Sequence, residues 1–345
     1  MTLLDINELT VKFGGLKAVN NVTVSVSPNE IVSLIGPNGA GKTTVFNVCT
    51  GIYEPTSGRV CFSGTDVCRP FCWQTALGLA LVGVITAKFL ALAVNIESLW
   101  ANAITGNYVY QQPFPWMKAL ISARETLAGH WVLPASIGFV VGIAGAFAVW
   151  QRSRRAPEIS ARAGIARTFQ NIRLFNQMTV LNNVLIGMDT QLRTQLWHAA
   201  LRLPLFWRER REAEKSAVEI LRFVGIDRHL NELAENLSYG DQRRLEIARA
   251  LAMKPKLLML DEPAAGMNPN ETQGLMGLIR KIRERGVTVL LIEHHMQVVM
   301  GISDRIAVLD HGEKIAEGTP KEVCCDPKVI EAYLGKDEGG GMRDE

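Results

Sequence analysis

The apolar and polar positions divide the chain into blocks with different periods. Residues 1–68 alternate short apolar runs with Gly, Pro and Asn turns, and two of these runs, Ile31–Ile35 and Arg59–Phe62, predict strands. Residues 158–336 alternate helical and strand periods, which is typical of βαβ units around a parallel sheet. Residues 337–345 hold three glycines among charges and predict a disordered tail. The pattern therefore predicts one α/β domain formed by residues 1–68 and 158–336, with residues 69–157 inserted into it.

The interrupting block, residues 69–157, contains two long apolar runs. Ala76–Ile96 has a single charge, Lys88, and Trp131–Trp150 has none. Each run approaches the roughly 20 apolar residues that a helix needs to cross a bilayer. The block therefore predicts an inserted helical hairpin that lies in a membrane. The alternatives are two buried or interfacial helices, or a foreign insertion that misfolds.

Flanking charges and small residues predict an orientation and a seam for this hairpin. Three arginines, at 152, 154 and 155, follow the second run, whereas the connecting segment Glu97–His130 has only two basic residues, so both ends of the hairpin are expected in the cytosol. Lys88 is expected to face the hairpin interior or a partner rather than lipid. Small residues also recur every four positions, which lets two helices approach closely in lipid. They are Gly83, Ala87 and Ala91 in one run and Gly138, Gly142 and Ala146 in the other.

Composition narrows the class of protein. With 48% hydrophobic and 21% charged residues over 345 positions, the chain is expected to fold around a sizeable core. A net charge of +3 gives no argument for nucleic acid, and the basic run Arg208–Arg211 includes a glutamate, so we read it as a solvated helix face. The first 20 residues lack a secretory signal pattern, and the six cysteines lack metal-ligand spacing, so free thiols in the cytosol are expected.

A glycine-rich loop carries the strongest chemical signal. Gly36–Thr43 reads Gly-Pro-Asn-Gly-Ala-Gly-Lys-Thr, which matches the phosphate-binding pattern GxxxxGK[ST] between a predicted strand and a helix-compatible run, Thr44–Thr50. Glycines let backbone N–H groups surround phosphate oxygens at the positive end of the following helix. Lys42 would place its charge at the β- and γ-phosphates, and Thr43 would offer a hydroxyl to Mg²⁺.

A pair of carboxylates forms the second candidate. Lys256–Leu260 predicts a buried strand that runs into Asp261 and Glu262. Beside a phosphate-binding loop, the first carboxylate is placed to hold Mg²⁺ and the second to polarise an attacking water. A charged strand end that meets solvent is the alternative, and the presence of the loop argues against it.

Further motifs make the chain resemble the ATP-binding subunit of an ABC transporter. Leu237–Gln242 is similar to the family's signature loop, and Arg243–Ala252 follows as the signature helix. Gln170 matches the Q-loop glutamine, His294 the switch histidine, and Phe13 the aromatic residue that stacks on adenine. The resemblance implies a P-loop NTPase core with an antiparallel β subdomain and a helical signature subdomain over roughly 171–250. It covers the chain outside residues 69–157 and the tail.

Longer runs are similar to one branch of that family, the branched-chain amino acid subunits of the LivG type. The resemblance implies an ATP hydrolase that powers import of leucine, isoleucine and valine or related amino acids. The implied partners are a second ATPase subunit, identical or different, two transmembrane permease subunits and, indirectly, a periplasmic binding protein, with no nucleic acid. The implied location is the cytoplasmic face of the inner membrane. The runs are Ala163–Phe175, Leu237–Ala252, Leu260–Pro269, Met300–Arg305 and Ala332–Gly335.

The resemblance also implies roles for individual residues. ATP would be bound by Phe13, Gly36, Pro37, Asn38, Gly39, Ala40, Gly41, Lys42, Thr43, Thr44, Ser238, Gly240 and Gln242. Catalysis is implied for Lys42, Gln170, Glu262 and His294, and Mg²⁺ binding for Thr43, Gln170 and Asp261. Ser238 and Gly240 would act on the nucleotide held by the partner subunit.

Three positions depart from the wider family. Tyr239 stands where Gly is usual in the signature loop, Asn268 where Asp is usual, and His295 follows the switch histidine where Asp is usual. Neighbours on a strand point to opposite sides, so only one of the two adjacent histidines would face the nucleotide, and the motif offset favours His294.

Two other classes of function compete with the importer. A non-transport ABC ATPase of translation or DNA repair usually has two ATPase cores, a coiled coil or zinc ligands, and this sequence has a single P-loop and no such motifs. A non-hydrolysing, membrane-anchored regulator would not need Lys42, Asp261 and Glu262 together. An ATPase assay separates the second class from the importer.

Overall fold

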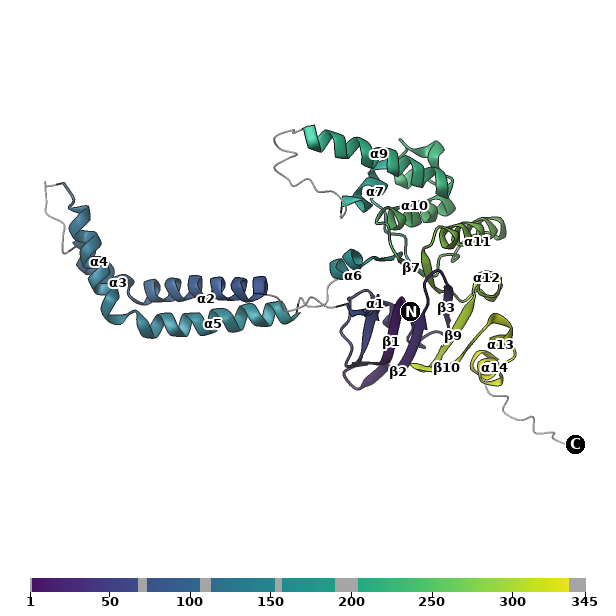
Figure 1. Ribbon diagram of the computed structural model, residues 1–345, viewed down its shortest axis with the longest axis horizontal. Coiled ribbons are helices and arrows are strands. Elements are labelled where there is room, and N and C mark those ends of the chain that lie inside the picture. Colours follow the sequence, from purple (N-terminus) through teal and green to yellow (C-terminus); the bar gives the residue numbers. More distant parts are fainter. Residues whose placement is uncertain (1, 68–72, 106–112, 153–156, 190–203, 335–345) are drawn as a thin grey trace, which may run out of the picture. The chain divides into compact units, whose positions relative to one another are not determined.

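A computed structural model describes residues 2–67, 73–105, 113–152, 157–189 and 204–334. The chain forms two compact units, of which one is Met1–Val67 with Arg155–Glu345 and the other is Cys68–Arg154 (Figure 1). The predicted disordered tail, residues 337–345, lies outside the described residues, as do the arginines at 154 and 155.

Six strands form the central sheet of the first unit, in the order β10-β9-β3-β8-β7-β6. All neighbouring strands are parallel except β10, which pairs antiparallel with β9. Parallel strands with both faces covered carry continuous apolar runs, and β3, β7 and β8 are buried at every position. The predicted α/β fold and the strand Ile31–Ile35 are therefore confirmed. The bounds are β3 (Ile31–Ile35), β6 (Ile165–Arg167), β7 (Leu257–Asp261), β8 (Thr288–Ile292), β9 (Arg305–Asp310) and β10 (Glu313–Gly318).

Side chains on the two faces of this sheet join two different apolar clusters. In β7, Leu258 and Leu260 belong to one cluster, while Leu257 and Met259 belong to the other, as strand alternation requires. The first cluster includes apolar residues of α11, and the second includes those of α1. Helices of this part are α1 (Lys42–Cys49), α6 (Pro157–Ala163), α11 (Pro269–Glu284), α12 (Met296–Ile302), α13 (Pro320–Cys324) and α14 (Pro327–Leu334).

A second, antiparallel sheet has the strand order β2-β1-β4-β5. Its longest strands form a hairpin, in which Phe13 pairs with Leu16 across the two glycines between them. The buried residues of these strands join the same apolar cluster as α1, so this sheet covers the phosphate-loop side of the core. The implied antiparallel β subdomain is present. Its strands are β1 (Leu4–Phe13), β2 (Leu16–Val26), β4 (Ser57–Phe62) and β5 (Thr65–Asp66).

A helical segment contains α7 (Val180–Gly187), α9 (Pro204–Val224) and α10 (Tyr239–Ala252), with short 3-10 turns at Asp227–His229 and Ala234–Asn236. The resemblance implies a helical subdomain over roughly 171–250, but residues 171–179 at its start are not helical. Helix α7 begins only after Thr179, whose hydroxyl accepts from the N–H of Asn182 and so caps the helix. The amide of Asn183 satisfies the preceding loop by bonding the carbonyls of Phe175, Met178 and Thr179.

The second unit is helical. Helices α2 and α5 run antiparallel and side by side (Figure 1), because Gly83 lies opposite Phe139 and Ile143, while Gly138 lies opposite Thr86 and Ala87. The helical hairpin expected from the two apolar runs is therefore present. Both helices are long and apolar enough to cross a membrane by length and composition. The elements are α2 (Trp73–Val94), α3 (Ile96–Leu99), a π-helical turn at Trp100–Ile104, α4 (Trp116–His130) and α5 (Val132–Arg152).

Candidate functional site

The candidate residues meet at the carboxyl-terminal edge of the central sheet. The loop Gly36–Thr43 follows β3, His294 follows β8, Asp261 and Glu262 lie at the end of β7, and Gln170 follows β6. These four strands are neighbours and parallel, so their carboxyl ends meet at one edge. Residues that are as much as 258 positions apart in sequence, Gly36 and His294, therefore border one site.

Two glycines of the phosphate loop are required by backbone geometry. Gly36 has a φ of 150° and Gly41 a φ of 94°, a region that residues with a Cβ atom rarely adopt. A Cβ atom at Gly36 would lie 2.0 Å from the carbonyl oxygen of Leu309, and one at Gly41 would lie 2.5 Å from that of Ala18. These two positions hold the loop tightly against β9 and β2.

Lys42 is buried beneath this loop. Its Nζ donates to the carbonyl oxygens of Gly36 at 2.7 Å and Pro37 at 2.8 Å. Burial lowers the pKa of the Lys42 ammonium, and the carboxylates of Glu262 and Asp261 oppose that shift. A cation held by loop carbonyls is positioned to meet an incoming phosphate without a large rearrangement.

A cavity of about 440 Å³ lies over the loop. Its lining brings the predicted phosphate-binding residues together with Gln170 and Glu262. Among the described lining residues, the signature loop and Phe13 are absent; the Phe13 ring instead packs edge-on against Tyr53 at 5.2 Å. The residues of the loop that line the cavity are Asn38, Gly39, Ala40, Gly41, Lys42, Thr43 and Thr44. A glycine cradle with one buried ammonium fits the phosphates of a nucleotide.

Glu262 is the centre of a polar cluster beside this cavity. Its Oε2 accepts a hydrogen bond from Gln170 Nε2 at 2.8 Å and lies 3.8 Å from His294 Nδ1. Its backbone adopts a φ of 47°, which is uncommon for a residue with a side chain and is often found at functional sites. Glu262 thus lies within reach of two other predicted catalytic residues, Gln170 and His294.

The adjacent histidines differ in their surroundings. His295 Nδ1 lies 3.9 Å from Glu293 Oε2, whereas His294 is the one beside Glu262. Glu293 is fully buried and accepts from the backbone N–H groups of Ala264, His294 and His295. This buried carboxylate, which sequence analysis did not single out, positions the switch segment and favours His294 as the residue that faces the site.

Asp261 forms a buried ion pair that sequence analysis missed. Its Oδ2 lies 2.7 Å from Arg167 Nη2, and both side chains are almost fully buried. Arg167 also donates to Asn47 Oδ1 at 2.6 Å, so it joins β6, β7 and α1. The carboxylate expected to hold Mg²⁺ is thereby held in place by a cation on the neighbouring strand.

The signature loop is organised as the start of α10. Ser238 is the residue that caps the helix: its hydroxyl accepts from the N–H of Asp241 and donates to the Asp241 carboxylate at 3.0 Å. Helix α10 begins at Tyr239, four residues before the predicted helix, because this cap satisfies its first turn. Gly240 is buried against Glu271, and Gln242 Nε2 donates to the carbonyl of Leu237.

A buried charged pair connects α10 to the Q-loop. Arg243 is fully buried and donates to the Glu246 carboxylate at 2.7 Å and to the carbonyls of Phe169 and Gln170 at 2.8 Å each. Glu246 in turn accepts from the N–H of Phe169. Burial raises the pKa of Glu246, and the bonds from Phe169 and Arg243 oppose that shift. These bonds connect the Q-loop directly to the signature helix.

Asn268 has a structural role that its departure from the family did not reveal. Its side chain caps α11 by accepting from the N–H of Glu271, whose carboxylate accepts from the N–H of Asn268. Asn and Asp are about equally good at this position, so the cap does not depend on the usual residue.

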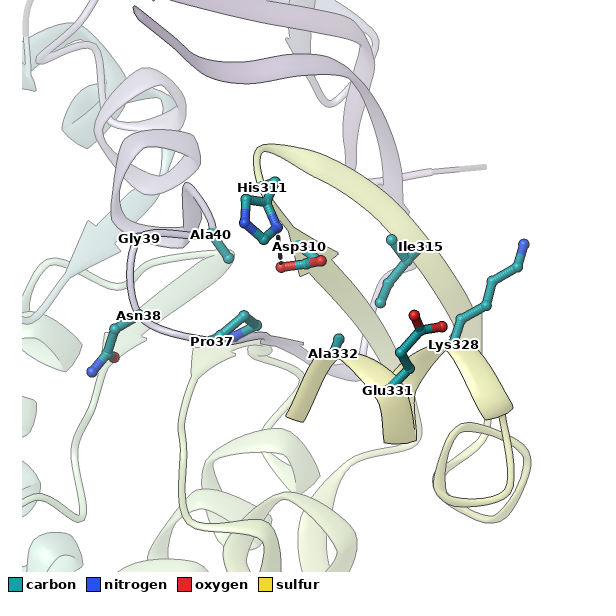
Figure 2. Close-up of a pocket in the computed structure, with 10 residues that line it drawn as sticks. All are labelled: Pro37, Asn38, Gly39, Ala40, Asp310, His311, Ile315, Lys328, Glu331 and Ala332. Carbon is teal, nitrogen blue, oxygen red and sulfur yellow. Dashed lines mark ion pairs between the residues drawn. The ribbon is translucent and has the colours of Figure 1, made fainter. Parts of the chain in front are cut away.

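A larger cavity, of about 800 Å³, is lined by the phosphate loop together with residues of α14 and the turn after β9 (Figure 2). It shares Asn38, Gly39, Ala40 and His311 with the smaller one. Figure 2 shows His311 pointing toward Asp310, at 2.8 Å between Nδ1 and Oδ1. Near this cavity the hydroxyl of Tyr333, in α14, makes a hydrogen bond with the backbone of Gly36, while burial raises the Tyr333 pKa. The C-terminal helix thus touches the phosphate loop, a contact that no sequence motif indicated.

Two family models match the chain. The model described as ABC transporter matches residues 19–97 and 145–265. The model described as branched-chain amino acid ATP-binding cassette transporter matches residues 313–339, which include α14. The gap within the first match falls inside the helical hairpin.

Similar proteins match over almost the whole chain. The high-affinity branched-chain amino acid transport ATP-binding protein LivG of Escherichia coli K12 is 39% identical over 97% of this chain and 98% of that protein. BraF of Pseudomonas aeruginosa, which carries the same description, is 37% identical over the same shares. A crystal structure of a nucleotide-free ATP-binding cassette from an ABC transporter is 26% identical over 97% of this chain and 100% of that chain, with a TM-score of 0.63. A related structure in its ADP conformation has a TM-score of 0.62.

Proposed function

Because the chain belongs to the ABC transporter family, in the group of branched-chain amino acid ATP-binding proteins, we propose that it drives uptake of branched-chain or related amino acids by hydrolysing ATP. One observation of the site supports this more than any other. Glu262 bonds Gln170 and lies beside His294, at the edge of the cavity that the phosphate loop lines.

We propose the following chemistry for these residues. The loop amides and Lys42 hold the β- and γ-phosphates and stabilise the charge that develops as the terminal phosphoryl group is transferred. Glu262 Oε2 accepts a hydrogen bond from the attacking water and orients its lone pair toward phosphorus. Gln170 and His294 fix the Glu262 carboxylate, so positioning accounts for most of the catalysis.

We propose that Mg²⁺ accompanies ATP and is held by Thr43, Gln170 and Asp261. Oxygen donors of this kind suit a small hard cation that also takes phosphate oxygens and water. Thr43 and Gln170 line the cavity, and Asp261 is fixed by Arg167, which supports the fit. The ion would neutralise phosphate charge during transfer.

We further propose that the site is completed by a second ATPase subunit, a copy of this chain or a close relative. Ser238, Gly240 and Gln242 would act on the ATP of that partner, since the N-terminal end of α10 favours phosphate. Phe13, which is 46% exposed, would stack on adenine. Two membrane permease subunits and a periplasmic binding protein would select the amino acid, and the ATPase would lie on the cytoplasmic face of the cell membrane.

Co-expression with its permease subunits and reconstitution into vesicles tests this function. We expect ATP-dependent uptake of leucine, isoleucine or valine and an ATPase rate that rises when the loaded binding protein is added. Hydrolysis without coupled uptake of any amino acid would favour a non-transport ATPase. Binding of ATP without hydrolysis would favour a regulatory subunit.

A further inference from the structure

The helical hairpin exposes an apolar surface that is unusual for a protein in water. Only 17% of the most apolar 18-residue stretch of α2, and the same share of α5, is buried inside the structure. Side chains such as Leu81, Ile85, Val140 and Val141 are all more than half exposed. Monomeric soluble proteins rarely leave so much contiguous apolar surface uncovered.

Two ordinary explanations of long apolar helices fail here. A helix in the core of a soluble protein is mostly buried, and these are not. A secretory signal lies near the N-terminus, whereas α2 begins at Trp73, after β1–β5 and the complete phosphate loop. Among the described residues, the three apolar core clusters of the chain include none from 73–152, so the hairpin contributes nothing to the ATPase core.

The contact between α2 and α5 is of the kind that holds helices together in lipid. A Cβ atom at Gly83 would lie 2.8 Å from Ile143, and one at Gly142 would lie 1.9 Å from Thr86 Oγ1. Thr86 donates across the pair to the carbonyl of Gly138 at 2.8 Å. Small residues with an interhelical hydrogen bond provide close packing where apolar burial gives no advantage. The apolar side chains are correspondingly directed outward.

The length of α2 matches the thickness of a bilayer, and the positions of the tryptophans match its interfaces. At 1.5 Å per residue, the 22 residues of α2 extend about 33 Å, close to the roughly 30 Å of a hydrocarbon core. Five of the seven tryptophans belong to this unit, and four of them lie near the ends of α2 and α5, as at membrane interfaces. Trp73 and Trp150 lie at the open end, and Trp100 and Trp131 at the other end, while Trp116 begins α4.

The single charge of α2 has a place within the hairpin. Lys88 lies on the α4 side of the helix midpoint and lines an apolar pocket of about 690 Å³ together with Arg124 of α4 and Trp131. Its hydrocarbon stem can follow the pocket while the ammonium reaches the polar interface beside Arg124. Lys88 therefore does not oppose insertion as an isolated charge would.

We propose that residues 73–152 span a lipid bilayer as a hairpin and anchor this ATPase in the membrane without a permease. Both ends of the hairpin lie on the side of the ATPase, where Arg152 and the arginines that follow it outnumber those of the far loop. This anchor does not depend on the transported substrate, so it can be tested independently of the proposed function.

Cell-free synthesis of the full chain with protein-free vesicles of phosphatidylcholine and phosphatidylglycerol tests the anchor. After alkaline carbonate extraction, the wild-type chain should float with the vesicles. The double variant Leu81→Arg with Val141→Arg puts charges at the middle of both lipid-facing surfaces and should lower the floated fraction at least tenfold. The matched control, Leu205→Arg with Trp207→Arg on exposed apolar positions of α9, should float like the wild type.

Protease accessibility measures insertion of the wild-type chain directly, without any substitution in the hairpin. Trypsin added outside the vesicles should cut near Arg152 and leave Lys118 and Arg124 uncut, and detergent should expose both. Wild-type chain that carbonate removes, or rapid cutting at Lys118 in intact vesicles, would overturn the proposal. Retention only when permease subunits are present would also overturn it and would identify the hairpin as a protein-docking surface. Nucleotide binding by each variant shows that its ATPase unit is folded.

Discussion

At the scale of single residues, the site depends on how one carboxylate is oriented. Glu262 is held by a hydrogen bond from Gln170, by the proximity of His294 and by a left-handed backbone conformation. None of these constraints involves the phosphate loop directly. Binding of the phosphates and positioning of the water therefore rest on different residues and should be separable by mutation.

Glu262→Gln should leave ATP binding largely intact, because Lys42 and the loop amides remain. Hydrolysis should fall by about 10²- to 10⁴-fold, the usual contribution of a general base. Fluorescent-nucleotide binding and steady-state phosphate release measure the two effects. Glu284→Gln, on an exposed residue of α11, is the control and should change neither. Near-normal turnover in the Glu262 variant would show that another group activates the water.

Sequence patterns identified the residues that define motifs and missed those that hold them. Lys42, Asp261, Glu262 and the phosphate loop are recognisable because their chemistry requires a fixed local spacing. Arg167 reaches Asp261 from the neighbouring strand, and Glu293 precedes His294 in sequence but also accepts from the distant Ala264. No local pattern distinguishes a buried arginine or glutamate from an exposed one. Only the three-dimensional structure reveals such pairs.

At the scale of elements, α10 and the Q-loop are joined by hydrogen bonds of two buried side chains. Arg243 and Glu246 lie one turn apart on α10 and bond both the carbonyls and an N–H of the loop. Local signals predicted the strand β3 correctly, because a mainly apolar run ends at a glycine. Residues 171–179 lie within the implied helical subdomain but form a loop, which the Asn183 side chain stabilises by bonding carbonyls four to eight residues earlier.

Arg243→Met should destabilise the ATPase unit by about 3–5 kcal/mol, because it leaves the Glu246 carboxylate buried without its cation. Denaturant unfolding measures the lost free energy of unfolding. Hydrogen exchange of the α10 amides shows whether the loss is located in that helix. Arg222→Met removes an exposed arginine 3.8 Å from Asp227 and should cost about 0–1 kcal/mol. Equal effects of the two substitutions would refute the coupling of α10 to the Q-loop. The double variant Arg243→Met with Glu246→Leu should recover part of the loss.

At the scale of the whole molecule, ATP would act as the ligand that joins two ATPase subunits. The differential affinity of ATP for the closed pair supplies the free energy of closure, and hydrolysis removes it. The signature loop is accessible to such a partner, because Tyr239 is 44% exposed. Ser238 caps a helix whose positive N-terminal end favours phosphate.

Ser238→Arg should abolish ATP-dependent dimerisation while each subunit still binds nucleotide weakly. The bulky side chain would occupy the place of the partner's γ-phosphate, and loss of the helix cap alone would cost only about 1 kcal/mol. Light scattering with and without ATP gives the result. Thr319→Arg removes the cap of α13 away from the signature loop and should leave dimerisation unchanged. Persistence of the ATP-dependent dimer in the Ser238 variant would exclude this interface.

The two units should also differ in what the ATPase requires. The core of the first unit is formed by strands and helices on both sides of the inserted hairpin, and its apolar clusters draw on neither α2 nor α5. The return of the chain is fixed within the first unit itself, where the Ser160 hydroxyl of α6 meets the carbonyl of Cys49 at the end of α1. Folding of the nucleotide site therefore needs continuity of the chain but no contact with the hairpin.

Joining Val67 to Pro157 through a short Gly/Ser linker should accordingly give a soluble protein that binds and hydrolyses ATP at a rate close to that of the full-length chain. A linker of different length between the same residues is the matched control, because a loop closes with only a weak dependence on its length. Glu262→Gln in the shortened protein should again remove hydrolysis. If the shortened protein is soluble and folded yet cannot bind ATP with either linker, the hairpin takes part in forming the nucleotide site, and its separation from the ATPase core is wrong.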